Sequence, residues 1–136
     1  MQKLTVGRVA RAAGVSIDTV RFYERLGLIA ASTRTEGGFR VFDSTAVERI
    51  HFVRQAKALG FTLKEVAELL SLSEMPDASC ADVRRRTEAK LVEIDGRIAR
   101  LQRIRQALSA LSRACPAKGP VSTCTILDAL HTERLQ

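Results

Sequence analysis

The feature that most constrains this chain is a proline-free stretch from Ala81 to Arg113, in which apolar residues recur at intervals of three and four. This spacing is typical of an amphipathic α-helix. Its apolar stripe is formed by Leu91, Ile94, Ile98, Leu101, Ile104, Leu108 and Leu111. At 1.5 Å per residue such a helix extends about 50 Å. Because no other part of the chain is large enough to cover the stripe, we expect the helix of a second copy, parallel or antiparallel, to cover it.

The charge of the chain indicates an anionic partner. Lys and Arg total 22 against 15 Asp and Glu, which gives a net charge of +7 over 136 residues. This excess favours nucleic acid over a membrane surface. The sequence has no secretory signal at its N-terminus and no apolar run of the roughly 20 residues needed to span a bilayer, so we expect a cytoplasmic protein with no membrane partner. An enzyme is the least favoured class, because no Ser/His/Asp set, paired carboxylates or phosphate-cradling glycine loop is evident.

The N-terminal segment from Leu4 to Leu28 predicts two short helices on either side of a tight turn. Gly14 suits the positive φ that such a turn requires. Ser16 is a suitable cap for the second helix, and Asp18 in its first turn is favoured by the helix dipole. This pattern predicts a helix-turn-helix.

The next segment, "RTEGGFRVF" from Arg34 to Phe42, has a Gly-Gly pair followed by alternating apolar residues. This pattern predicts a small β-hairpin with arginines near its tip. Such a hairpin beside a helix-turn-helix would be a wing.

Two further helices are predicted before the long one. The first begins after a cap at Asp43 or Ser44 and runs to about Leu59, with Gly60 as its stop. The second begins at Thr62, where the segment 62–65 fits a reciprocal capping box. "SEMPDAS", residues 73–79, has the composition of a linker.

The three cysteines lie at the ends of the long helix and around a loop. Cys80 precedes the helix, Cys115 follows it, and Cys124 closes the loop "CPAKGPVSTC". Within one chain the first two would lie about 50 Å apart. In an antiparallel dimer, Cys80 of one subunit would meet Cys115 and Cys124 of the other. This arrangement predicts two equivalent three-thiolate sites per dimer, suited to soft cations.

Other interpretations of the cysteines stay open. A single free cysteine is often a small buried hydrophobe. A disulfide framework is less favoured, because the number of cysteines is odd and the expected compartment is reducing. A thiol redox sensor, with an intersubunit disulfide between Cys80 and the loop, is the more serious alternative.

The whole chain resembles the MerR family of metal-responsive transcriptional regulators. The resemblance rests on "TVGRVARAAGVSIDTVRFYERLGLI", "RTEGGFRVF", "FVRQAKALGFTLKEVAELL" and "CPAKGPVSTC". It implies a homodimer that binds double-stranded promoter DNA and, on binding metal, distorts the DNA so that RNA polymerase holoenzyme can use the promoter. By position it assigns mainly phosphate contacts to Arg21, Tyr23, Arg34 and Arg40. A core position is the alternative for Tyr23, and a core position is expected for Phe22.

The resemblance favours a soft divalent metal, because members that sense monovalent copper, silver or gold are expected to carry Ser where this chain has Cys80. Hg(II) is favoured, since three thiolates suit a trigonal mercury site. Some blocks are similar to the zinc, cadmium and lead branch instead, so Zn(II), Cd(II) and Pb(II) stay open. A Cu(I) sensor and a multidrug-type regulator are less favoured.

The predicted fold is mainly α. Residues 1–72 are expected to form a winged helix-turn-helix DNA-binding domain with its second helical pair, and residues 73–80 a linker. Residues 81–114 are expected to form the dimerisation helix, in an antiparallel coiled coil. Its interface would include Leu91, Ile94, Ile98, Leu101 and Leu108. Residues 115–136 are expected to form the metal-binding loop and a short helix.

Overall fold

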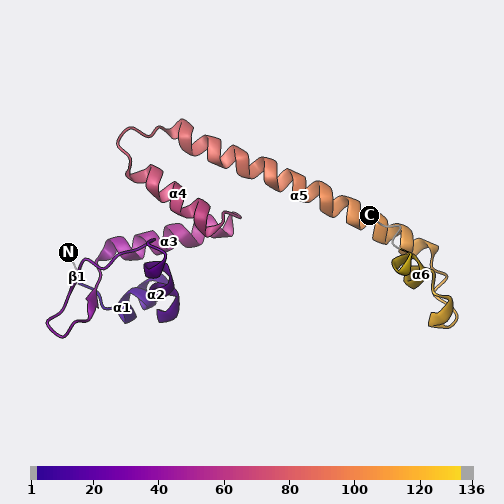
Figure 1. The fold of residues 1–136 in the computed structure, drawn as a ribbon, viewed down its shortest axis with the longest axis horizontal. Helices are drawn as coiled ribbons and strands as arrows, with labels where there is room; N and C mark the ends of the chain where they lie inside the picture. Colours follow the sequence, from indigo (N-terminus) through magenta and orange to yellow (C-terminus); the bar gives the residue numbers. More distant parts are fainter. Residues whose placement is uncertain (1–2, 133–136) are drawn as a thin grey trace. The chain divides into compact units, whose positions relative to one another are not determined.

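The computed structural model describes residues 3–132 (Figure 1). It begins with two helices, α1 (Val6–Ala13) and α2 (Ile17–Arg25). Gly14 ends α1 with a φ of 72°, in the left-handed region that glycine tolerates without a steric penalty. The hydroxyl of Ser16 accepts a hydrogen bond of 3.1 Å from the Thr19 N–H, which caps α2. The predicted helix-turn-helix is confirmed, including both of its turn residues.

A short antiparallel hairpin follows, formed by β1 (Thr33–Arg34) and β2 (Arg40–Val41). Its register places Arg34 opposite Arg40. The hairpin is held to the start of the chain by Leu4, which exchanges two backbone hydrogen bonds of 2.7 Å with Phe42. The predicted wing is therefore present, and its base is fixed beside the start of α1.

The second helical pair consists of α3 (Ser44–Ala58) and α4 (Leu63–Glu74). The Asp43 carboxylate caps α3 by accepting a 2.9 Å hydrogen bond from the Thr45 N–H. The reciprocal capping box of α4 is complete, because Thr62 and Glu65 each accept from the backbone N–H of the other. Gly60, with a φ of 96°, lies in the turn between the helices, as expected.

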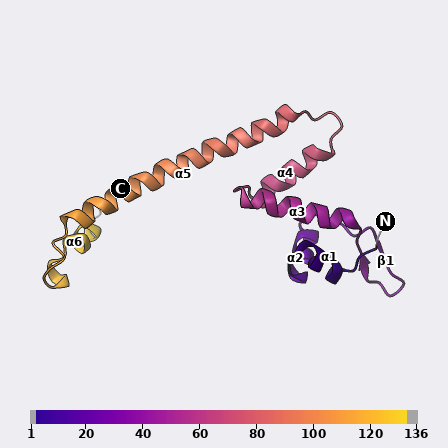
Figure 2. The ribbon, with the colours of Figure 1, turned by 180° about the vertical axis from the view of Figure 1, so that it is seen from behind.

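One hydrophobic core joins these elements. Figures 1 and 2 show α3 lying across α1 and α2, with α4 on its other side. The largest fully buried side chains come from every helix of this group and from the wing: Val9, Val20, Phe42, Ile50, Val53 and Val66. The core thus fixes α2 and the wing relative to each other.

The expected core position of Phe22 is wrong. Its side chain is 40% exposed, whereas Tyr23 is 8% exposed and belongs to the core. The reason is helix geometry, because Val20 and Tyr23 are three positions apart and share the face of α2 that packs inward. Phe22 lies about 100° away around the helix.

The long helix α5 runs from Cys80 to Ala114, 35 residues. It begins where the Asp82 carboxylate accepts hydrogen bonds from the backbone N–H and the hydroxyl of Ser79, at 2.9 and 3.3 Å. The linker is shorter than the predicted residues 73–80: α4 includes Glu74, and this capping starts α5 at Cys80. Residues 75–79 therefore connect the two helices. The mainly helical fold with a long C-terminal helix is confirmed.

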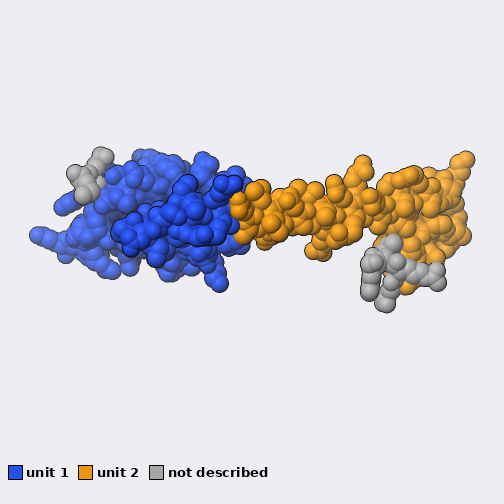
Figure 3. Space-filling model, turned by 90° about the horizontal axis from the view of Figure 1, so that it is seen from above, with its two compact units in different colours: residues 1–86 blue, residues 87–136 orange. Residues whose placement is uncertain are grey.

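The structure divides into two compact units, residues 1–86 and 87–136 (Figure 3). The second unit contains most of α5, a 3₁₀ turn at Val121–Thr123 and α6 (Thr125–His131). Residues 133–136 of the predicted C-terminal segment lie outside the described residues, and the predicted domain division stays a prediction. Within residues 3–132, no helix combines the length and the apolar character that a membrane span requires.

Candidate nucleic-acid interface and metal ligands

The structure brings three of the predicted DNA-binding residues together. Arg21 on α2 and the two wing arginines, Arg34 and Arg40, line one hollow of about 830 Å³ between α2 and the wing. Arg21 and Arg40 also line a second hollow of about 240 Å³ beside it. All three side chains are exposed. A cluster of exposed arginines beside a helix-turn-helix can bind phosphate oxygens through charge-assisted hydrogen bonds.

Tyr23, the fourth predicted DNA-binding residue, lies in the core beneath this surface. Its ring centroid is 6.0 Å from that of Phe22, with the rings tilted by 40°. The Arg25 guanidinium lies 5.9 Å from the Phe22 ring centroid, within the range of a cation–π contact. The exposed aromatic ring of α2 therefore supports Arg25, and a DNA contact by Tyr23 stays a prediction.

The structure adds two charged residues, Glu24 and Arg25, to the predicted DNA-binding set. From the sequence, Glu24 is only an alternative ion-pair partner for Arg21. The Glu24 carboxylate lies 2.8 Å from Nε of Arg40 and forms an ion pair between α2 and the wing. One signal in the sequence pointed to Glu24. It follows Arg21 by three positions, so the two residues share a face of the predicted helix. Its pairing with the wing depends on the tertiary fold.

This ion pair matters because two like charges repel each other within the wing. Arg34 and Arg40 are directly opposite each other on neighbouring strands, where like charges are destabilising. The Arg34 guanidinium donates a weak hydrogen bond of 3.5 Å to the Gly38 carbonyl oxygen at the wing tip. The Glu24 carboxylate, through its ion pair with Arg40, offsets part of this repulsion.

The three cysteines are free thiols, and none of them is buried. Cys80 is the exposed first residue of α5. Cys115 follows the last residue of this helix, and Cys124 precedes the first residue of α6. Their positions do not fit small buried hydrophobes. Within the described part of a single chain, no three His, Cys, Asp or Glu side chains come close enough to hold a metal ion.

Local contacts shape the loop between Cys115 and Cys124. Ala117 has a φ of 58° and Gly119 a φ of 92°, so the backbone turns twice through the left-handed region. The Thr123 hydroxyl then donates a 2.9 Å hydrogen bond to the Pro120 carbonyl oxygen. The loop is thus folded by its own hydrogen bonds and turns, which a cysteine-flanked ligand loop requires.

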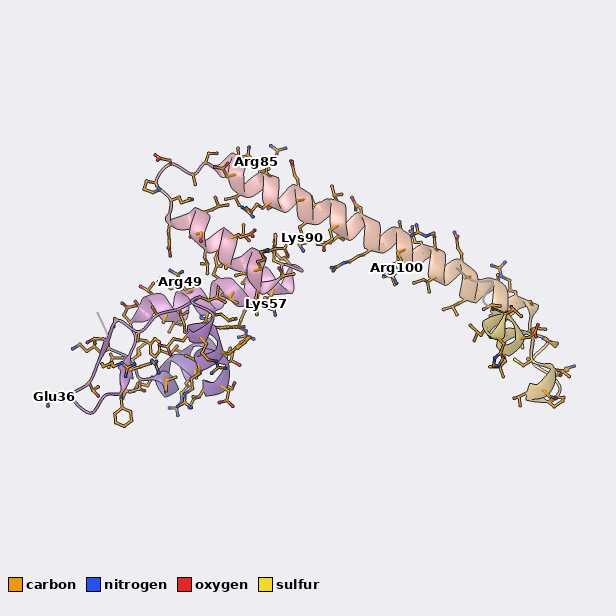
Figure 4. All side chains as sticks on the ribbon, in the orientation of Figure 1. Glu36, Arg49, Lys57, Arg85, Lys90 and Arg100 are labelled. Carbon is orange, nitrogen blue, oxygen red and sulfur yellow. The ribbon has the colours of Figure 1, made fainter. Side chains whose placement is uncertain are left out.

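The predicted dimer residues leave an apolar stripe on α5 facing solvent in the single chain. Leu91, Ile98, Leu101 and Leu108 are exposed, with Leu101 at 64%, and Ile94 is half-buried. Figure 4 shows that charged side chains such as Arg100 also extend from this helix. An exposed apolar stripe of this length on one helix is typical of a surface that another helix covers.

Two helices joined by a tight turn and followed by a two-stranded wing define a winged helix-turn-helix DNA-binding protein. Comparison with known families agrees with this class. The family described as "MerR HTH family regulatory protein" matches residues 4–73, and that described as "MerR, DNA binding" matches residues 47–111.

Individual relatives match along nearly the whole chain. The mercuric resistance operon regulatory protein of Bacillus cereus is 38% identical over 128 residues, which cover 94% of this chain and 97% of that protein. The lead(II) complex of PbrR691 from Ralstonia metallidurans CH34 is 31% identical, with a TM-score of 0.85 over 93% of this chain and 98% of that one. The mercury(II) complex of MerR from Bacillus megaterium MB1 is 34% identical, with a TM-score of 0.71 over 90% and 94%.

The chain belongs to the MerR family of transcriptional regulators. Members of this family are DNA-binding regulators and not enzymes.

Proposed function

We propose that this protein is a metal-responsive activator that binds promoter DNA as a homodimer and responds to a soft divalent ion, with Hg(II) favoured. The observation that carries the proposal is the placement of unburied cysteines at both ends of α5. One helix of 35 residues is about 52 Å long, so one ion cannot bind both ends of the same chain. Two antiparallel copies would bring opposite ends together.

In this arrangement Cys80 of one subunit and the loop cysteines of the other, Cys115 and Cys124, would hold the ion. Thiolates are soft ligands that select Hg(II), Pb(II), Cd(II) and Zn(II) over hard cations. The exposed apolar stripe on α5 supports the pairing, because burying it against a second copy removes large apolar surface from water. The turns at Ala117 and Gly119 support the metal loop, because they allow the backbone between the two cysteines to reverse.

The identity of the metal is a finer proposal. The identity to the Bacillus cereus mercuric regulator over nearly the full chain favours Hg(II). The alternative is a sensor of Zn(II), Cd(II) or Pb(II), and the higher structural similarity to PbrR691, solved with lead(II), supports this branch. A competition titration of the reduced dimer with both ions, with Cd(II), Zn(II) and Cu(I) alongside, ranks them by ligand-to-metal absorption. Tightest binding of Cu(I) with no effect of Cys80→Ser would contradict the three-cysteine site.

Mixed dimers test whether the site is shared between subunits. Neither the Cys80→Ser homodimer nor the Cys115→Ser/Cys124→Ser homodimer has a complete set of ligands. A dimer with one subunit of each kind regains one complete site if the ligands come from opposite subunits, and none if they come from one. We expect such mixed dimers, purified with two different tags, to bind one equivalent of Hg(II) tightly. The absence of tight binding would contradict the shared site.

On DNA, we propose that the surface of Arg21, Arg34 and Arg40 grips the phosphate backbone of an operator. The dimer would then distort the promoter when metal binds, so that RNA polymerase holoenzyme can use it. These events would occur in the cytoplasm, where a bacterial promoter lies. We expect Arg40→Ala to weaken binding across operator sequences and to lower the slope of log K against log salt by about one unit. An effect confined to one base position would mean that Arg40 reads sequence.

A further inference from the structure

We infer that Glu24 is a positioning residue for DNA binding, which holds the Arg40 guanidinium of the wing in the orientation that meets a phosphate. The inference rests on the proposed phosphate contact of Arg40. Glu24 is a carboxylate on a surface that is otherwise rich in arginine. Its negative charge repels DNA phosphates, so its presence there points to another purpose.

The geometry of the pair explains that purpose. The Glu24 carboxylate meets Nε of Arg40 at 2.8 Å. A guanidinium carries its N–H donors in a fixed planar fork. The ion pair at Nε therefore limits the directions that the terminal nitrogens can take, and these are the donors suited to a phosphate oxygen. Without this ion pair, the long side chain of Arg40 would sample many rotamers before each contact.

The two side chains differ in exposure as this role requires. Glu24 is 17% exposed and Arg40 is 52% exposed. The carboxylate is the more covered partner, and the guanidinium is the more open to solvent. An incoming phosphate therefore meets the guanidinium more readily than the carboxylate, whose charge is offset by the ion pair.

The position of the pair within the surface supports the same role. Glu24, Arg21 and Arg40 line both hollows between α2 and the wing. The ion pair of Glu24 and Arg40 therefore lies where the two hollows meet. Glu24 also belongs to the helix that carries Arg21. The ion pair therefore links the wing's proposed phosphate contact to that of α2.

A double-mutant cycle tests the inference. The DNA is a duplex that the wild-type protein selects from a random-sequence pool, and a duplex with the same bases in shuffled order is the reference. The proteins are wild type, Glu24→Ala, Arg40→Ala and the double variant, and the dissociation constant is measured for each. We expect Glu24→Ala to weaken binding about fivefold when Arg40 is present. In the Arg40→Ala background, the same change should leave binding unchanged or strengthen it.

Two further variants separate the ion pair from the net charge of the surface. Glu24→Gln keeps the size of the side chain and removes the charge that forms the ion pair, so it should weaken binding as Glu24→Ala does. Glu36→Ala is the matched charge control, because Glu36 lies in the loop at the wing tip (Figure 4). Its loss should leave binding unchanged or slightly stronger. Circular dichroism and sedimentation of each variant check folding and dimerisation.

Each result decides between alternatives. Stronger binding of Glu24→Ala in both backgrounds would mean that Glu24 acts only as a repelling charge and would overturn the inference. Equal weakening in both backgrounds would mean that Glu24 acts through α2 and not through Arg40, which also overturns it. If Arg40→Ala weakens binding but Glu24→Ala does not, the inference alone fails. An Arg40→Ala variant with wild-type affinity would overturn the proposed phosphate contact itself.

Discussion

The guanidinium of Arg54 donates a 3.0 Å hydrogen bond to the carbonyl oxygen of Ala13, which lies 41 positions earlier in the chain. The bond satisfies an orphan carbonyl at the end of α1 with a charged donor from α3. It lies beside Gly14, the turn residue of the helix-turn-helix, since a Cβ built there would be 3.4 Å from Nη1 of Arg54. The angle between the first two helices is thus stabilised from the second helical pair.

Replacing Arg54 with Ala should destabilise the protein by about 1–2 kcal/mol, because the change leaves a charge-assisted hydrogen bond unmade. The measurement is urea unfolding of the metal-free protein. Lys57→Ala is the matched control, since Lys57 is an exposed cation on the same helix (Figure 4). Equal losses for the two variants would contradict a specific role of the Arg54 bond.

Replacing both Ile98 and Leu101 with Glu should convert the proposed dimer into monomers, because two charges would be buried in its apolar interface. Sedimentation velocity gives the mass, and operator affinity should fall with it. Val92→Glu is the control. Val92 is also exposed and apolar, but it lies about 100° around the helix from Leu91. A double variant that remains dimeric would exclude this stripe as the interface.

The free energy of unfolding should depend on pH in the acid range, through Asp82 at the start of α5. The hydrogen bond from the Ser79 backbone N–H, followed by the nearby Arg85 charge, holds the pKa of Asp82 below its ordinary value of 3.8. A carboxyl whose pKa is lowered by folding stabilises the folded state above its unfolded pKa. This contribution is lost as the pH falls through the lower, folded value.

The difference in free energy of unfolding between the wild type and Asp82→Asn should therefore be constant near neutral pH. It should shrink below about pH 3.8. Urea unfolding over a pH series measures it. Asp95→Asn, elsewhere on α5, removes the same charge without the Ser79 contact. A difference that grows toward acid pH would contradict the capping role of Asp82.

Gly96 offers a test of the face assigned to the dimer. It lies inside α5, where a Cβ would meet no atom within 4 Å among the described residues. It also lies on the side of the helix opposite the apolar stripe. Gly96→Ala should therefore raise the free energy of unfolding by roughly 0.5–1 kcal/mol, through the higher helix propensity of alanine. A loss of stability would indicate that a partner helix packs on this face.

Local signals in the sequence were sufficient to predict most of the fold. Gly14, Ser16 and the capping box at Thr62 act within a few residues, so their outcome depends little on the rest of the chain. The burial of Tyr23 in place of Phe22 could not be read from composition, because both are aromatic and adjacent. It depends on which face of α2 packs against α1.

The candidate sites were predictable to different degrees. The arginines of α2 and the wing were expected from their motifs, and the structure places Arg21, Arg34 and Arg40 around one hollow. The pairing of Glu24 with Arg40 was not predictable, because it joins two elements through the tertiary fold. The cysteine site stays a prediction from helix length, since its proposed ligands belong to two chains.

The uninterrupted helix between Cys80 and Cys115 has a consequence for how such regulators diversify. In an antiparallel pair, lengthening α5 by one heptad would preserve its apolar stripe and bring the same cysteines together again at each end. Only the separation of the two ends would change, by about 10 Å. Helix length could then change without altering which cysteines meet at each proposed metal site.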